Sequence, residues 1–249
     1  MGQMTMLYGL RPPATMTSGT AVPSYLATNA GTPGNVLKPW KGTTLGADYL
    51  QIDLGATAAI SGLALNAGNM SSVTVFADNS NPPTTNRGTL TLSQDGQGRW
   101  KGSMAVVMAV RYIRFTIAAG TPNDGATGWS IANALVFAST FSPPRDPLFS
   151  GSSIDSNTPQ SRADLDNGVV ICDNTGAPFE TITLSFSGGA GDGHEQIQRY
   201  ARAGVCWLNL GVATAPWYQW PVFHYDPKVT RKLSGFNREL VDITLKEVA

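Results

Sequence analysis

Charged side chains are scarce in this sequence. Asp, Glu, Lys and Arg make up 14% of the 249 residues, whereas about 25% is average for soluble domains. The 17 basic residues balance the 17 acidic ones, so the formal net charge is zero. Proteins that bind nucleic acid through electrostatics need an excess of positive charge, so this composition excludes direct nucleic-acid recognition. So little charge also predicts a surface that is partly covered by partner molecules.

Cysteines and long apolar runs are also missing. Cys172 and Cys206 are the only cysteines, so the chain has no disulfide framework and no C-x-x-C zinc motif. The longest uncharged apolar run, Met104–Val110, is far shorter than the ~20 residues that span a bilayer. The first 13 residues lack the basic and apolar regions of a secretory signal. We therefore expect a soluble chain that is made in a reducing cytoplasm and does not insert into a membrane.

The common catalytic and phosphate-binding motifs are absent. No G-x-S-x-G elbow occurs, and the glycine-rich segment 188–193 lacks the Lys-Ser/Thr of a phosphate loop. His194-Glu195 begins like the zinc motif H-E-x-x-H, but Gln198 stands in place of the second histidine. Cys206 lies in an apolar run, which favours a buried, inert thiol. The sequence predicts that the protein is not an enzyme and has no catalytic residues, metal site or cofactor.

Glycine and proline are frequent, with 27 and 16 copies, and they separate many short apolar runs. Some runs alternate with a period of two, as in the segment 72–77, which is typical of β-strands. This pattern predicts a mainly β fold, with a β-sandwich over residues 21–139. The expected strands are Tyr49–Leu54, Ile60–Leu65, Ser72–Ala77, Thr89–Ser93, Met104–Val110, Arg111–Ala118 and Ala132–Ala138.

The composition changes near residue 140. Residues 140–160 are rich in Ser, Pro and Gly and predict a linker. Residues 161–249 then predict a small α+β domain. Its expected strands are Gly168–Asp173, Thr181–Ser187, Val205–Leu210 and Glu239–Lys246.

A single helix is predicted in this second domain, over His194–Ala203. Asp192 precedes the helix and Glu195 follows three residues later, which is the spacing of a capping box. Ile197 lies on its apolar face, and Gly204 supplies the stop signal.

Three segments of the first domain resemble strands of discoidin, or coagulation factor 5/8 type C, domains. They are Asp48–Gly55, Arg111–Phe115 and Trp129–Phe137. The resemblance implies a galactose-binding-like jelly roll. Within these strands we expect Arg111 and Arg114 to pair with Asp48 or Asp53 at the edge of the sandwich, a structural role.

The resemblance also points to candidate sugar-binding residues. Discoidin-like domains present aromatic or basic residues on the loops at one end of the sandwich, and the corresponding stretch here offers Lys38, Trp40 and Lys41. Trp40 is also interpreted as the core tryptophan of the fold. If the domain binds sugar, Trp100 and Trp129 are further candidate stacking platforms.

A structural calcium ion is an open alternative to the absence of any metal. The segment Asp164–Gly168 carries oxygen ligands, but it lacks the later acidic residue of a calcium loop. Asp-Asn-Gly before a strand is chiefly a turn signal.

Aromatic residues are concentrated between residues 217 and 225. A domain of about 90 residues cannot bury all of these rings, and aromatic residues are enriched in interface cores. We therefore predict a subunit interface or domain core here, with sugar stacking as the alternative. The residues concerned are Trp217, Tyr218, Trp220, Phe223 and Tyr225.

The first 20 residues form an N-terminal arm in this interpretation. Met4, Met6, Tyr8 and Leu10 alternate with other residues, yet the arm has no core of its own. We expect it to dock on a neighbouring subunit.

The whole layout resembles a distal or minor tail protein of a long-tailed bacteriophage. The resemblance implies a structural virion protein, made in the host cytoplasm. Residues 161–249 would form a ring at the tail tip with other copies, as a hexamer or trimer. The jelly rolls would point outward to neighbouring tail tube and tail tip proteins or to a host cell-surface glycan. The alternative is a carbohydrate-binding module without catalytic activity.

Overall fold

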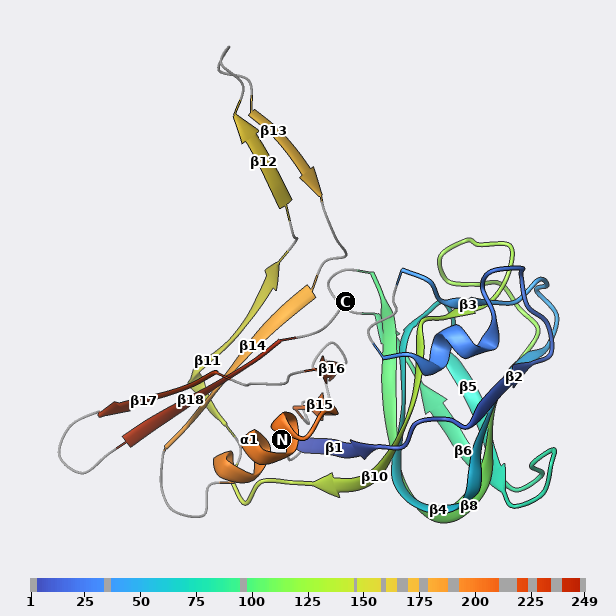
Figure 1. Ribbon diagram of the computed structural model, residues 1–249, viewed down its shortest axis with the longest axis horizontal. Coiled ribbons are helices and arrows are strands. Elements are labelled where there is room, and N and C mark those ends of the chain that lie inside the picture. Colours follow the sequence, from blue (N-terminus) through green and yellow to red (C-terminus); the bar gives the residue numbers. More distant parts are fainter. Residues whose placement is uncertain are drawn as a thin grey trace.

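The computed structural model is built mainly of β-strands (Figure 1). It describes residues 4–33, 37–94, 98–145, 147–157, 160–164, 170–174, 179–187, 193–210, 219–223, 228–233 and 239–246. The strands are β1 (Thr5–Leu10), β2 (Thr15–Ser18), β3 (Trp40–Lys41), β4 (Asp48–Gly68), β5 (Ser72–Asp78), β6 (Asn86–Thr91), β7 (Ser93–Gln94), β8 (Trp100–Ile117), β9 (Ser130–Ile131), β10 (Asn133–Phe141), β11 (Leu148–Asn157), β12 (Gln160–Asp164), β13 (Val170–Asn174), β14 (Phe179–Phe186), β15 (Val205–Asn209), β16 (Gln219–Phe223), β17 (Lys228–Leu233) and β18 (Glu239–Lys246). The helices are a 3₁₀ turn, η1 (Ala27–Gly31), and the α-helix α1 (His194–Arg202).

Two long strands, β4 and β8, organise the N-terminal half. They have 21 and 18 residues and pair along most of their length, but the register shifts between Asp53 and Ala58. Bulges of this kind bend a strand and increase its twist. Figure 1 shows both strands turning at this point. Each strand therefore contributes one half to each layer of a sandwich.

The first layer contains β2, the first half of β4, the second half of β8, β5 and β6. The second layer contains β1, β10, the other halves of β4 and β8, and β7. Leu50 and Ile52 of β4 point inward and are fully buried, and they alternate with outward-facing neighbours as the pleat requires. Full burial of a side chain of this size stabilises the fold by about 1.5–3 kcal/mol.

The N-terminal arm belongs to its own chain. β1 lies between β10 and β15, antiparallel to both. Met4 and Met6 are fully buried in the C-terminal core, and the ring of Tyr8 stacks on Tyr200 of α1 with centroids 3.9 Å apart. The expectation that the arm docks on a neighbouring subunit is therefore wrong. The arm has no core of its own because both halves of the same chain supply one.

The C-terminal half adds a four-stranded antiparallel sheet with the order β11–β14–β18–β17. β18 has the predicted bounds, and Val241, Ile243 and Leu245 are buried on one of its faces. Ile197 and Ala201 of α1 join the same core. The fold class predicted from the sequence, a jelly-roll sandwich with a small α+β unit and one helix, is confirmed for the described residues.

Residues 140–160 do not form the predicted linker. β10 continues to Phe141, and β11 occupies Leu148–Asn157 opposite β14. The Ser- and Gly-rich sequence of β11 has little intrinsic strand preference, and pairing with a distant strand overrides it.

The described residues show a different N-terminal cap for α1 from the predicted capping box. Gly193 is the N-cap residue, with a φ of +84° and no side-chain cap hydrogen bond. Asp192 lies outside the described residues. The C-terminal stop is as predicted, because Gly204 follows the helix with a φ of +136°, a conformation that favours glycine.

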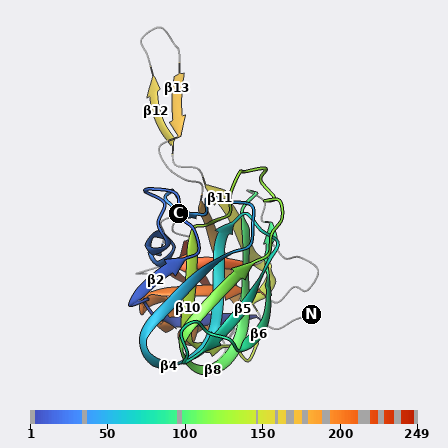
Figure 2. The same ribbon diagram turned by 90° about the vertical axis from the view of Figure 1, so that its right-hand side faces the viewer.

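β12 and β13 form a hairpin that stands apart from both halves of the molecule (Figures 1 and 2). Their backbones pair with each other from Gln160 opposite Asn174 to Asp164 opposite Val170. Among the described strands they pair with no other. No helix in the described part of the chain is long and apolar enough to cross a membrane.

Candidate functional site

The tryptophans predicted as sugar platforms lie mostly in the core. Trp40 has no exposed surface, and its indole N–H donates to the backbone oxygen of Thr20 at 3.0 Å. Trp129 is 3% exposed and donates to the backbone oxygen of Gly46 at 2.9 Å. Neither ring has a free face on which a sugar could stack, so Trp40 has the core position. Trp100 is half-buried.

The two lysines beside Trp40 lie at the surface. Lys38 is exposed, and Lys41 is half-buried with its Nζ 4.4 Å from the centroid of the Tyr25 ring. This cation–π contact holds Lys41 against the protein. A sugar-binding role for Lys38 and Lys41 stays a prediction.

The predicted aromatic interface is described only in part. Trp217, Tyr218 and Tyr225 lie outside the described residues. Trp220 and Phe223 belong to β16, where their backbones pair with Leu208 and Val205 of β15. The strands of both sandwich layers, together with β15 and β16, form one continuous ten-stranded sheet, and β16 is one of its end strands. A position at a sheet edge suits an interface role, which stays a prediction.

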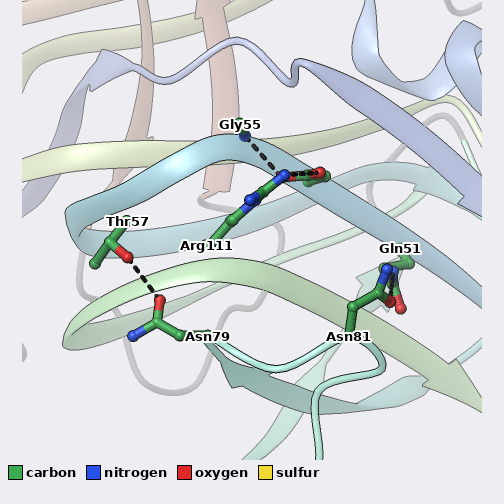
Figure 3. Close-up of polar contacts among 7 residues, drawn as sticks. Gln51, Gly55, Thr57, Asn79, Asn81 and Arg111 are labelled. Atoms are coloured by element: carbon green, nitrogen blue, oxygen red, sulfur yellow. Dashed lines mark hydrogen bonds and ion pairs between the residues drawn. The ribbon is translucent and has the colours of Figure 1, made fainter.

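The outward face of the first layer carries a network of polar and aromatic side chains, and Figure 3 shows part of it. Because Leu50, Ile52, Ile113 and Phe115 point into the core, the residues between them point outward.

One half of this network is the predicted ion pair. Arg111 Nε lies 2.8 Å from Asp53 Oδ1, and Nη2 lies 3.0 Å from Oδ2. This is the bidentate geometry typical of Arg–carboxylate pairs. The hydrogen bond from Arg111 lowers the pKa of the Asp53 carboxyl below its usual value. The Asp53 carboxylate also accepts the N–H of Gly55 at 2.7 Å. The expectation of an Arg111–Asp53 pair is confirmed.

The other half corrects the expectation that Arg114 pairs with Asp48 or Asp53. Arg114 donates through Nε and Nη2 to Oε1 of Gln51, at 2.9 and 2.7 Å. Its guanidinium carbon also lies 4.1 Å from the centroid of the Tyr49 ring. Gln51 Nε2 in turn donates to Oδ1 of Asn81 at 3.0 Å, and Figure 3 shows these two side chains meeting.

Asp48 is not an arginine partner. It is 4% exposed and accepts the backbone N–H groups of Tyr49 at 2.7 Å and Thr20 at 3.1 Å, together with the Thr20 hydroxyl. This carboxylate fastens the segment after β2 to the start of β4.

The loop that supplies Asn81 is held by Asp78. The Asp78 carboxylate accepts the backbone N–H groups of Ser80, Thr84 and Thr85 at 2.7, 2.7 and 3.0 Å. Burial raises the pKa of Asp78, but these N–H groups and the Thr85 hydroxyl outweigh burial and hold the pKa at about 2. A hydrogen bond also joins this loop to β4, because the Thr57 hydroxyl donates to Asn79 Oδ1 at 2.9 Å.

Cys206 and possible metal clusters are the remaining candidates. Burial raises the pKa of the Cys206 thiol to about 12, so this cysteine is inert at neutral pH, as predicted. In the described part of the chain no three His, Cys, Asp or Glu side chains converge on a metal position. What the first-layer face can do chemically is bind, through N–H groups, hydroxyls and aromatic rings.

Comparisons with solved structures find carbohydrate-binding domains. A chitosan-binding module from a Paenibacillus chitosanase/glucanase is 22% identical, covering 51% of this chain and 96% of the module, with a TM-score of 0.41. The lectin domain of Lectinolysin, solved with Lewis B antigen, is 19% identical, covering 50% of this chain and 92% of that domain, with a TM-score of 0.40. A family 32 carbohydrate-binding module from C. perfringens, solved with galactose, is 18% identical, covering 53% and 98%, with a TM-score of 0.42. No protein-family model and no curated protein matches the sequence.

Proposed function

We propose that this chain is a non-catalytic structural subunit that assembles with copies of itself, as in a distal or minor tail protein of a long-tailed bacteriophage. It would be a virion component, and its sandwich would face outward. The observation that carries this proposal is the β12–β13 hairpin.

The hairpin exposes backbone groups that favour a partner. A two-stranded hairpin alone is marginally stable in water, and β12 and β13 pair with no other described strand. Unpaired strand edges are templates for pairing with another chain. A neighbouring copy that covers the hairpin would stabilise it and fix its direction.

The four-stranded sheet offers an edge that suits the hairpin. β17 is an end strand of that sheet, so among the described strands its outer edge pairs with no other. Different surfaces of two copies would therefore meet head to tail. Such contacts close into a ring when the rotation between copies allows it, and we expect a hexamer or trimer. Each contact needs about 1,000 Å² or more of buried surface. The tail tube and tail tip proteins would be its neighbours.

A second candidate function is carbohydrate binding by the sandwich. The observation that favours it is the outward-facing pair Tyr49 and Arg114, which combines an aromatic ring with hydrogen-bond donors and is held over the buried Gln51. The two functions are compatible, because the hairpin and this face belong to different halves of the chain.

Light scattering and negative-stain imaging of the full chain test assembly. We expect a multimer with cyclic symmetry, which dissociates when residues 160–174 are replaced by a short Gly-Ser turn. Ala163→Pro, which removes a backbone N–H from β12, should weaken assembly, and Ala163→Thr, which keeps it, should not. A wild-type protein that is monomeric at every concentration, or a ring that survives loss of the hairpin, refutes the proposal.

A further inference from the structure

We propose that the outward face of the first layer binds anionic, oxygen-rich oligosaccharides through a patch formed by Tyr49, Asn81 and Arg114 over the buried Gln51, called here the Arg114 patch. This inference goes beyond self-assembly, and its ligand class rests on the second candidate function. The patch lies on the face of the sheet and does not include the predicted residues Lys38 and Lys41.

The first argument is the balance of donors and acceptors. Gln51 Oε1 already accepts two hydrogen bonds from Arg114, and Asn81 Oδ1 accepts one from Gln51. The neighbouring Asp53 carboxylate is used by Arg111 and by the N–H of Gly55. The side-chain acceptors of this region are therefore engaged within the protein, which leaves mainly donors for a ligand.

The donors that remain point to an acceptor-rich ligand. A guanidinium carries five N–H groups, and Arg114 uses only Nε and one N–H of Nη2 on Gln51. The Asn81 amide N–H groups and the Tyr49 hydroxyl have no acceptor among the described residues. Several oxygens of one ligand can engage these donors together.

The second argument is charge. Within the described chain, Arg111 is neutralised by Asp53, but Arg114 has only the neutral Gln51 as its hydrogen-bond partner. Arg114 therefore contributes an uncompensated positive charge to a half-buried position. Hydrogen bonds between charged groups are about twice as strong as neutral ones. A carboxylate or sulfate group of a sugar complements this position, and a neutral sugar does not.

The third argument is preorganisation. The Arg114 guanidinium is held on one side by the Tyr49 ring at 4.1 Å and on another by Gln51. Asn81 is held by Gln51 and by a loop that Asp78 fastens. Groups that are already ordered lose less conformational freedom when a ligand binds.

Affinity electrophoresis or calorimetry of the full chain tests the proposal with three polysaccharides and one nucleic acid. The probes are polygalacturonate, which carries carboxylates, dextran sulfate, neutral dextran and single-stranded DNA. We expect the wild-type protein to bind one or both of the acidic polysaccharides more tightly than dextran or DNA. The carboxylated and sulfated probes separate the two anionic groups.

Substitutions locate the site. Arg114→Gln should weaken binding of the acidic polysaccharide by about 10-fold or more, since it removes charge-assisted hydrogen bonds. Arg114→Lys keeps the positive charge but loses the planar guanidinium. Its affinity for the acidic polysaccharide should lie between those of the wild type and Arg114→Gln. Arg202→Gln makes the same charge change at an exposed position on α1 and should leave binding unchanged. Circular dichroism and melting temperature confirm that each variant is folded.

Three results would overturn the proposal. They are equal binding by Arg114→Gln and Arg202→Gln, wild-type binding that favours dextran or DNA, and no binding to either acidic polysaccharide. Binding to dextran alone would leave carbohydrate binding standing at another site. The mass of the Arg114→Gln protein by light scattering should equal that of the wild type, so a failure here is distinguishable from a failure of the assembly proposal.

Discussion

Truncation of Met6 tests whether β1 is an integral part of its own chain. The side chain has no exposed surface and belongs to the C-terminal core, while its backbone pairs with Phe141 on one side and Leu208 on the other. Met6→Ala removes three heavy atoms from a packed site. Substitutions of this type cost about 2–5 kcal/mol. In a chain of this size each kcal/mol lowers the melting temperature by about 2–4 °C, so a loss of about 3 kcal/mol lowers it by roughly 6–12 °C.

Thermal unfolding followed by circular dichroism measures this loss. The measurement is repeated over a wide range of protein concentrations, because a core within one chain gives a shift that does not depend on concentration. Val107→Ala is the matched control, since Val107 is 90% exposed. Its effect should stay within about 0.5 kcal/mol.

A different result would refute the position of β1. If Met6→Ala melts like the wild type but assembles poorly, then Met6 contacts another copy and the strand is exchanged between subunits. A shift that vanishes at low concentration would lead to the same conclusion.

Three further predictions follow from single residues. Asp78 has a lowered pKa of about 2, so its hydrogen bonds stabilise the fold fully above pH 4. That contribution, about 1–2 kcal/mol, should be lost as the pH falls from 4 to 2, and acid titration of Asp78→Asn should lack this step. Gly102→Ala should lower the free energy of unfolding by about 1–3 kcal/mol, because its Cβ would lie 2.2 Å from the Thr91 backbone oxygen. Denaturant unfolding measures this loss. Gly46→Ala is the control, because its Cβ would make only an ordinary van der Waals contact. Cys206 should resist thiol reagents at pH 8 in the native protein and react after unfolding, because burial raises its pKa to about 12.

The sequence predicts strands best where one face of the strand is exposed to solvent and the other is buried. β18 has the predicted bounds because its apolar residues alternate with Asp242, Thr244 and Lys246, and this pattern is local. β1 has a similar alternation, but its partners lie more than 120 residues away. Nothing in the arm indicates that they belong to the same chain. β11 was missed because its Ser and Gly residues have no strand preference of their own.

The candidate site was predictable only where opposite charges occur. The Arg111–Asp53 pair follows from scarce charges on neighbouring strands. The Arg114 patch depends on Gln51, an uncharged residue, and on Asn81, which arrives from a loop 30 residues later. Trp40 was ambiguous because the same residue type fills cores and binds sugars, and only its complete burial distinguishes the two uses.

The central position of β1 also constrains how the molecule forms during translation. β1 leaves the ribosome well before both strands that flank it, β10 and β15. Until residue 209 has emerged, one edge of β1 is unpaired. Met4 and Met6 also cannot be buried, because the core that surrounds them is incomplete. The nascent jelly roll can close earlier, whereas the four-stranded sheet can form only after β18 has been synthesised. Until β15 has emerged, the unpaired edge of β1 can pair with other incomplete chains.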